Sequence, residues 1–217
     1  MRGARFWLDT SVFTVLVFAA TAVIAVYQPF TGGYVNLGES MIYLAALISG
    51  PLVAGLAGGV GAALADLALG YAIFAPGTLV IKMAEGIVVG HLARRGGMAP
   101  LAAAIYAALF LSISYLSWGS SHTISVVSLI LAPAVAAAVL LASRREGWDR
   151  LPSLLVGGLV MVLGYFLYEF FLSNPLQGRP RIGALWEVPG NMIQVLVGAA
   201  IAVPVYAFLK RAGYVRD

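Results

Sequence analysis

The chain has 217 residues, of which 61% are hydrophobic and only 10% are charged. A soluble domain carries about 25% charged residues, so this composition excludes an ordinary soluble protein and predicts an integral membrane protein. The formal net charge of +4 does not indicate nucleic-acid binding, because the basic residues are divided among short segments between apolar runs. The sequence has no cysteine, which excludes thiolate catalysis and cysteine-ligated metal, and we predict no cofactor.

Eight hydrophobic runs predict helices at about 10–27, 38–49, 52–71, 77–94, 101–117, 122–142, 151–172 and 188–209. The second run is too short to cross a membrane alone, since crossing takes roughly 20 residues. Gly50-Pro51 ends it, because proline lacks a donor and disfavours helix for the residue before it. We therefore expect the second and third runs to form a tight hairpin or a broken pair inside the bundle.

The basic residues predict how the bundle is oriented. Most of the 13 lysines and arginines fall on one side if all eight runs cross: Arg2, Arg5, Arg94, Arg95, Arg144, Arg145, Arg150, Lys210, Arg211 and Arg216. By the positive-inside rule this side is cytoplasmic, and so are both termini. The fold expected from the residues alone is therefore an all-α, polytopic membrane bundle that forms a single domain over residues 1–217.

Acids and amides gather at the opposite ends of these runs. Ionisable side chains are expensive in hydrocarbon, so they usually face a bundle interior or a wet cavity. We therefore predict a polar pocket that opens to the outer face. The predicted substrate-binding residues are Asn36, Glu39, Lys82, Glu85, Tyr165, Glu169, Glu187, Asn191 and Gln194.

Several of these residues also have purely structural interpretations. Lys82 and Glu85 are three apart and can pair within one helix, although Asp66 is an alternative partner for the lysine. Glu39 near a helix N-terminus is favourable by the helix dipole alone. Asn191 and its neighbour one turn on, Gln194, can serve as hydrogen-bonding contacts between helices.

Tyr165 and Glu169 lie four residues apart on one helical face. A carboxylate beside a tyrosine suits a cationic or hydrogen-bonding ligand, whereas the alternative is an interfacial Glu169 in contact with water or with Arg179. The outer half as a whole is rich in acids. If they are ionised, the pocket should prefer amine-bearing or cationic solutes, although burial can keep some of them protonated.

Four stretches together resemble the substrate-binding membrane subunit, or S component, of energy-coupling factor (ECF) transporters. They are Asn36–Tyr71, Ala75–Gly86, Met161–Glu169 and Glu187–Gln194. The resemblance implies a binding subunit rather than an enzyme, in the plasma membrane of a prokaryote. Its expected ligand is a vitamin-like small organic molecule captured from outside, and its expected partner, besides membrane lipid, is a transmembrane coupling protein with two ATPase subunits.

The chain departs from the family pattern in two places. Family members commonly have six helices, so residues 101–142 resemble an inserted hairpin. The family often docks on the coupling protein through A-x-x-x-A in the first helix, and Thr21-x-x-x-Ala25 is the nearest pair here, with Ala19 and Ala22 adjacent. The N-terminal histidine arrangement of cobalt and nickel members is missing, which favours an organic substrate.

Two other functions are alternatives to a binding subunit. A self-sufficient secondary transporter coupled to protons or ions would be expected to show inverted repeats, and the sequence has no convincing internal repeat. An intramembrane enzyme would need an acid/base or metal constellation, and the carboxylates are scattered. ATP binding through a P-loop is excluded, because no G-x-x-x-x-G-K-[ST] run exists.

Overall fold

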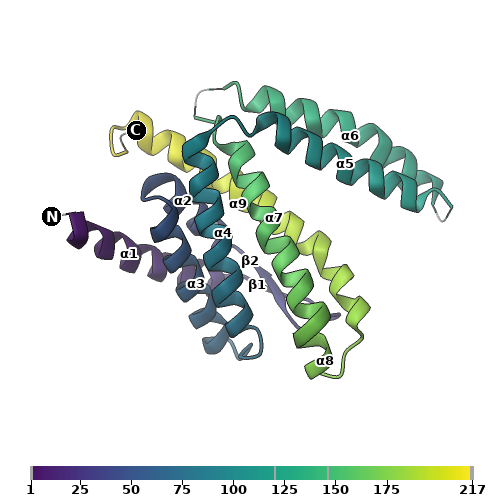
Figure 1. The fold of residues 1–217 in the computed structure, drawn as a ribbon, viewed down its shortest axis with the longest axis horizontal. Helices are drawn as coiled ribbons and strands as arrows, with labels where there is room; N and C mark the ends of the chain where they lie inside the picture. The colour runs from purple at the N-terminus through teal and green to yellow at the C-terminus, as the bar shows by residue number, and fades with distance from the viewer. Residues whose placement is uncertain (1, 120, 146, 216–217) are drawn as a thin grey trace.

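The computed structural model describes residues 2–119, 121–145 and 147–215. It is an all-α membrane bundle with a small β-hairpin at one end (Figure 1). The elements in chain order are α1 (Arg2–Val23), β1 (Ala25–Tyr27), β2 (Tyr34–Asn36), α2 (Gly38–Ile48), α3 (Pro51–Ala68), α4 (Ala75–Arg95), α5 (Ala99–Ser117), α6 (His122–Ala142), α7 (Leu151–Tyr168), the π-helical segment η1 (Glu169–Ser173), α8 (Asn174–Leu176), the 3₁₀ turn η2 (Arg181–Gly183) and α9 (Ala184–Arg211).

The expectation of a multi-pass membrane protein is confirmed. Among the described residues, five helical segments are long and apolar enough to span a membrane: Gly3–Val23, Pro51–Ala68, Ser125–Ala142, Leu151–Leu176 and Arg181–Arg211. Gly38–Ile48 and Ala99–Tyr115 are shorter apolar helices. The remaining predicted run forms α4, which is 21 residues long but carries four charged side chains.

The end of the first predicted helix is wrong. Helix α1 ends at Val23, and Ala25–Tyr27 pairs as an antiparallel strand with Tyr34–Asn36, in the register Ala25 opposite Asn36. Within the connecting loop, the Gln28 amide donates to the Gly33 carbonyl at 2.8 Å and the Gly32 amide donates to the Gln28 carbonyl at 2.9 Å. Valine, isoleucine and tyrosine favour strands as readily as membrane helices, so the apolar run did not reveal this change.

Helices α2 and α3 form the tight hairpin expected from Gly50-Pro51. Gly50 has a φ of 95°, a conformation that side chains with a Cβ rarely adopt, and Pro51 opens α3 at its first turn. Helix α2 is only 11 residues long, and most of its side chains are buried because α1, α3, α4 and α9 surround it.

Helices α3 and α4 pack backbone to backbone through glycines. A Cβ on Gly59 would lie 2.6 Å from the Leu79 carbonyl oxygen, and one on Gly86 would lie 2.6 Å from the Ala54 backbone. In lipid, such small residues allow close helix approach and dense van der Waals contact. This contact holds the outer ends of α3 and α4, which carry Asp66 and Lys82, at a fixed spacing.

The ends of the bundle differ in charge. The C-terminal ends of α4 and α9 and the N-terminal end of α7 lie toward the top of Figure 1, and α8 lies at the bottom. The top end carries Arg94 and Arg95 in the last turn of α4, and Lys210 and Arg211 in the last turn of α9. The positive-inside rule predicts that the top faces the cytoplasm. We call the opposite end the outer end; it contains α8 and the β1–β2 loop, which contacts Gln177 and Arg179 just after α8.

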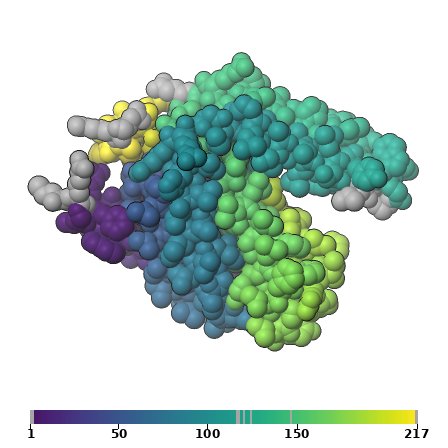
Figure 2. Space-filling model, in the orientation of Figure 1, coloured from purple at the N-terminus to yellow at the C-terminus, as the bar shows by residue number. Residues whose placement is uncertain are grey.

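Helices α5 and α6 form an antiparallel hairpin that projects sideways from the cytoplasmic end of the bundle (Figures 1 and 2). Its two helices pack mainly against each other, and α7 is their main neighbour in the bundle. Near its base, the buried Tyr106 hydroxyl donates to the Leu155 carbonyl at 3.2 Å. The expected insertion at 101–142 is therefore a helical arm attached along α7.

Candidate functional site

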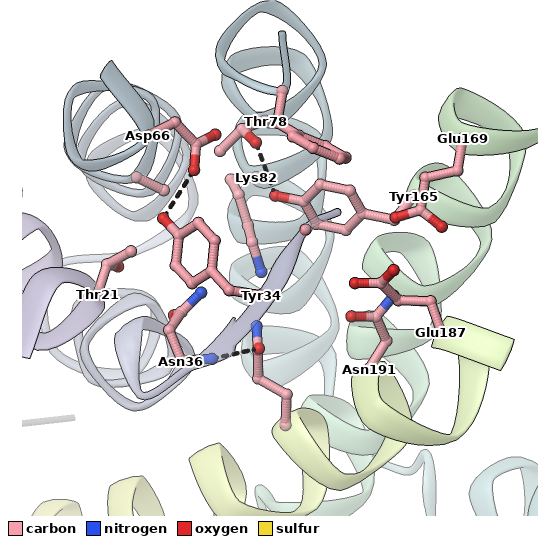
Figure 3. Close-up of a pocket in the computed structure, with 14 residues that line it drawn as sticks. Thr21, Tyr34, Asn36, Asp66, Thr78, Lys82, Tyr165, Glu169, Glu187 and Asn191 are labelled. Atoms are coloured by element: carbon pink, nitrogen blue, oxygen red, sulfur yellow. Dashed lines mark hydrogen bonds between the residues drawn. The ribbon is translucent and has the colours of Figure 1, made fainter. Parts of the chain in front are cut away.

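A narrow cavity lies among the outer ends of α1, α3, α4, α7 and α9, beneath the β-hairpin (Figure 3). Fourteen residues line it: Thr21, Gly33, Tyr34, Asn36, Ala62, Asp66, Phe74, Thr78, Lys82, Tyr165, Glu169, Glu187, Asn191 and Gln194. Most are polar, although they come from apolar helices. The sequence predicts a polar pocket at the outer ends of the helices, and the cavity lies at that depth.

Seven of the nine predicted binding residues line the cavity: Asn36, Lys82, Tyr165, Glu169, Glu187, Asn191 and Gln194. Glu39 and Glu85 do not line it. Both are fully buried behind Lys82 and form ion pairs with its ammonium group. The two glutamates therefore hold Lys82 in position at the cavity wall and do not themselves line the cavity.

Lys82 is the centre of the buried charge network. Its ammonium contacts the Glu39 carboxylate and lies 3.4 Å from the Glu85 carboxylate, while the centroid of the Tyr165 ring is 5.5 Å away. Tyr43 donates to Glu85 at 3.1 Å. The sequence left Glu85 and Asp66 open as partners of Lys82. The structure pairs Lys82 with Glu85 and also with Glu39, and it shows no ion pair between Lys82 and Asp66.

Gln194 links the cavity to this network. Its side-chain amide donates to Glu39 at 3.1 Å, and its carbonyl oxygen accepts the backbone N–H of Asn36 at 2.8 Å. The Asn36 side-chain oxygen accepts the Gly38 amide at 2.8 Å, which fixes the turn between β2 and α2. Because Gly198 packs directly against the Glu39 backbone, α9 holds both Gln194 and Glu39 in place.

The acids Glu169 and Glu187 line the cavity from α7/η1 and from α9 (Figure 3). Glu169 is the first residue of a π-helical segment, which Asn174-Pro175 follows. A proline cannot donate to the helix and clashes with the carbonyl four residues before it, and π-bulges of this kind frequently occur at functional sites. The Thr31 hydroxyl donates to Glu187, whereas Oε2 of Glu169 has no hydrogen-bond partner among the described residues.

Helix α9 begins earlier than predicted, at Ala184 rather than at about 188. Pro189 therefore lies inside the helix and not at its first turn, and the preceding 3₁₀ turn Arg181–Gly183 starts the chain reversal. The consequence is that Glu187, Asn191 and Gln194 are on one continuous helix. Their spacing of four and three residues places them on one face.

Asp66, Tyr34 and Thr78 line the cavity but were not among the predicted binding residues. Tyr34 donates to Asp66 at 2.7 Å, and Thr78 shares a hydrogen bond of 2.9 Å with Tyr165. Burial and the neighbouring Asp66 carboxylate raise the pKa of Tyr34, which keeps its hydroxyl protonated as a donor. Asp66 could have been predicted from the sequence, because it is an acid near the end of an apolar helix. No sequence feature distinguishes Tyr34 or Thr78 as a binding residue.

The β1–β2 loop covers the outer side of the cavity. Besides the Thr31 contact with Glu187, Arg179 donates to the Pro29 carbonyl at 2.7 Å and the Gln177 amide lies 3.4 Å from the Thr31 carbonyl. The Thr31 contact joins the loop between the first two strands to α9, and the other two join it to the segment between α7 and α9.

The four residues predicted to dock on a partner do not share one face. Ala25 lies in β1, and Thr21 is buried and lines the cavity. Ala19 is exposed and Ala22 is half-buried on α1. The predicted Thr21-x-x-x-Ala25 pair is therefore not a helical pair, because α1 ends at Val23, and Ala19 is the predicted docking residue that faces outward from α1.

The fold and site together define a multi-pass membrane protein with a polar cavity near one end of its helices. Residues 8–140 match the family described as "ECF-type riboflavin transporter, S component". The chain is also 31% identical over 194 residues to an "Uncharacterized protein in gap 3'region" from Pyrococcus woesei, an alignment that covers 89% of this chain and 94% of the relative. The chain belongs to the S-component family of ECF transporters, which is not a family of enzymes.

Proposed function

We propose that this protein captures a vitamin-like small organic molecule in the cavity and delivers it to an ATP-driven importer. The observation that carries the proposal is the convergence of polar side chains from five helices and a strand at the outer end of an S component. Buried polar groups without a structural role mark ligand pathways in membrane proteins. The cavity residues, with Glu39 and Glu85 in support of Lys82, form the proposed substrate site.

The first test identifies the ligand. The protein is purified from membranes in mild detergent, and small molecules released on denaturation are identified by mass spectrometry. The affinity of the recovered molecule is then measured for Asn191→Ala and for Ser153→Ala, a buried control at the cytoplasmic end of α7 whose hydroxyl donates to the Leu92 carbonyl. We expect at least tenfold weaker binding for Asn191→Ala only. Equal affinities in all three proteins would contradict the site.

We also propose that the partner is a transmembrane coupling protein with two ATPase subunits, in the plasma membrane of a prokaryote. The exposed side chains Val12, Leu16 and Ala19 form a stripe along α1 on the face away from the cavity. A close helix–helix contact requires small residues, so Ala19→Trp should prevent co-purification with the coupling protein while ligand affinity stays unchanged. Leu163→Trp, at an exposed site on α7 and outside this stripe, is the control.

Transport distinguishes this mechanism from a self-sufficient transporter. Uptake of the recovered ligand is measured in cells that produce this protein with or without the coupling protein and its ATPases. The proposal requires uptake to depend on the ATPase module. Uptake that persists without the module would instead support proton- or ion-coupled secondary transport.

A further inference from the structure

We propose that the substrate is an organic cation, an aromatic ring that carries an ammonium, amidinium or quaternary nitrogen. The inference rests on the proposed function and names the substrate class of the same cavity. It is carried by the charge balance of the cavity walls, by buried carboxylate oxygens that lack partners and by the aromatic lining.

The cavity walls are rich in acids, and two of these acids, Glu169 and Glu187, lie close enough to share a proton. Asp66, Glu169 and Glu187 line the cavity from three different elements and are 4%, 1% and 4% exposed. Lys82 is the one cationic side chain among the described lining residues, and Glu39 and Glu85 already pair with it. Among the described lining residues, an anionic ligand would therefore meet three buried acids and one lysine whose charge is already paired.

Arg179 offsets part of the charge of Glu187 but lies outside the cavity wall. It donates to the Pro29 carbonyl at 2.7 Å and packs over Gly32 in the covering loop, and it is not among the lining residues. A buried carboxylate without a compensating charge is costly in a low-dielectric interior. A ligand that brings a positive charge removes that cost and gains the interaction.

Unpartnered oxygens identify where such a ligand would be held. Oε2 of Glu169 and Oδ2 of Asp66 are buried and have no hydrogen-bond partner among the described residues. Figure 3 shows the two side chains at opposite sides of the cavity, with Tyr165 and Thr78 between them. Both oxygens can only accept when ionised, so a bound molecule should present donors at two separated positions.

The remaining walls suit a flat ring. Tyr34, Phe74 and Tyr165 line the cavity, and the faces of aromatic rings attract cations as well as other rings. Riboflavin, which the family description names, is uncharged and would leave the free carboxylates without a counter-charge. This chain should therefore prefer a different, positively charged solute.

The test compares matched probes on the full-length protein purified in detergent. Pyridoxamine and pyridoxine differ by an ammonium in place of a hydroxyl, and thiamine supplies a quaternary nitrogen where riboflavin is neutral. Binding of the four probes is measured by ligand-induced thermal stabilisation and isothermal titration. We expect the cationic member of a pair to bind at least tenfold more tightly, which corresponds to about 1.4 kcal/mol.

Variants connect the preference to the named acids. Glu169→Gln and Asp66→Asn should each reduce the preference for the cationic member at least threefold, whereas Asp9→Asn, which removes an acid outside the cavity near Arg5, should not. Two separate variants keep the test decisive if one fails to fold. A neutral probe that binds as tightly as its cationic partner, or a preference that survives both cavity variants, overturns the inference.

If no probe binds, the charge of the molecule recovered by mass spectrometry tests the inference. A recovered organic cation supports the inference, and a recovered neutral or anionic molecule overturns it while the proposed function stands. Wild-type protein that retains no small molecule and binds none of the four probes contradicts the proposed function itself. The two failures are therefore distinguishable.

Discussion

Lys82 of α4 forms an ion pair with Glu39 of α2, although the two side chains are only 2% and 0% exposed. Glu85, one helical turn after Lys82, lies 3.4 Å from the same ammonium. One buried cation is thus shared by two carboxylates from two helices. Loss of the shared cation from such a group is costly, because each ion lost its hydration on burial.

Removal of the shared cation should therefore destabilise the folded protein strongly. Lys82→Met leaves both glutamates without a counter-charge, and we expect a loss of about 3–5 kcal/mol, read as a clear drop in the thermal unfolding midpoint in detergent. Glu39→Gln should cost less, because the pair with Glu85 remains. Arg5→Met is the control, since Arg5 is 80% exposed in its contact with Asp9 and exposed pairs contribute about 0–1 kcal/mol. Equal effects of Lys82→Met and Arg5→Met would contradict the buried network.

The contact between α3 and α4 predicts a steric effect. In Gly59→Ala the new Cβ would lie 2.6 Å from the Leu79 carbonyl oxygen, a backbone atom that can move only with the whole helix. Overpacking of this kind costs about 1–3 kcal/mol, so the unfolding midpoint should fall. Gly3→Ala meets nothing within 4 Å and should leave the midpoint unchanged. If both alanines are tolerated equally, the two helices are not in backbone contact at this point.

The helices and the depth of the site could be predicted from the sequence, because both depend on local composition. Apolar runs define membrane helices, and Asn191, Gln194 and Glu169 were recognisable as costly side chains near the ends of such runs. Gly50-Pro51 identified the α2–α3 hairpin for an equally local reason. The family was recognisable because several such features occur together in order.

Features that depend on tertiary context could not be predicted. Ala25–Tyr27 continues an apolar run, and only pairing with Tyr34–Asn36 makes it a strand. The π-helical turn at Glu169 changes hydrogen bonding without any change of composition. The supporting position of Glu39 and Glu85 behind Lys82 follows from how α2 packs against α4, which residue spacing along one helix does not encode.

The covering loop should open when its contact with α9 is removed. In Thr31→Val the hydroxyl that donates to Glu187 is lost, and the loop keeps the contacts through Gln177 and Arg179 and the stacking of Phe30 on Trp186. We expect faster hydrogen exchange in peptides that cover Ala25–Asn36, because the Gln28 and Gly32 amides are protected only within this hairpin. Thr14→Val, which removes a hydroxyl bonded within α1, is the matched control. Unchanged exchange in Thr31→Val would show that Thr31 does not hold the loop.

The α5–α6 arm should be dispensable for the cavity. No described residue of Ala99–Ala142 lines it, and the Ser114 hydroxyl donates to the Ser125 carbonyl at 2.8 Å, which sets the register between the two helices. Ala107 and Ala132 lie opposite each other in that register. A short glycine-serine linker in place of residues 108–131 would therefore remove the outer part of the arm and keep its base.

We expect the shortened protein to retain its unfolding midpoint and to bind the recovered ligand within about twofold of the wild type. The base of the arm is different, because Tyr106 is buried and donates to the Leu155 carbonyl. Tyr106→Ala should lower the midpoint, since truncation of a buried aromatic side chain costs about 3–5 kcal/mol. A shortened protein that folds but no longer binds ligand would place the outer part of the arm in the binding mechanism, which the lining residues do not predict.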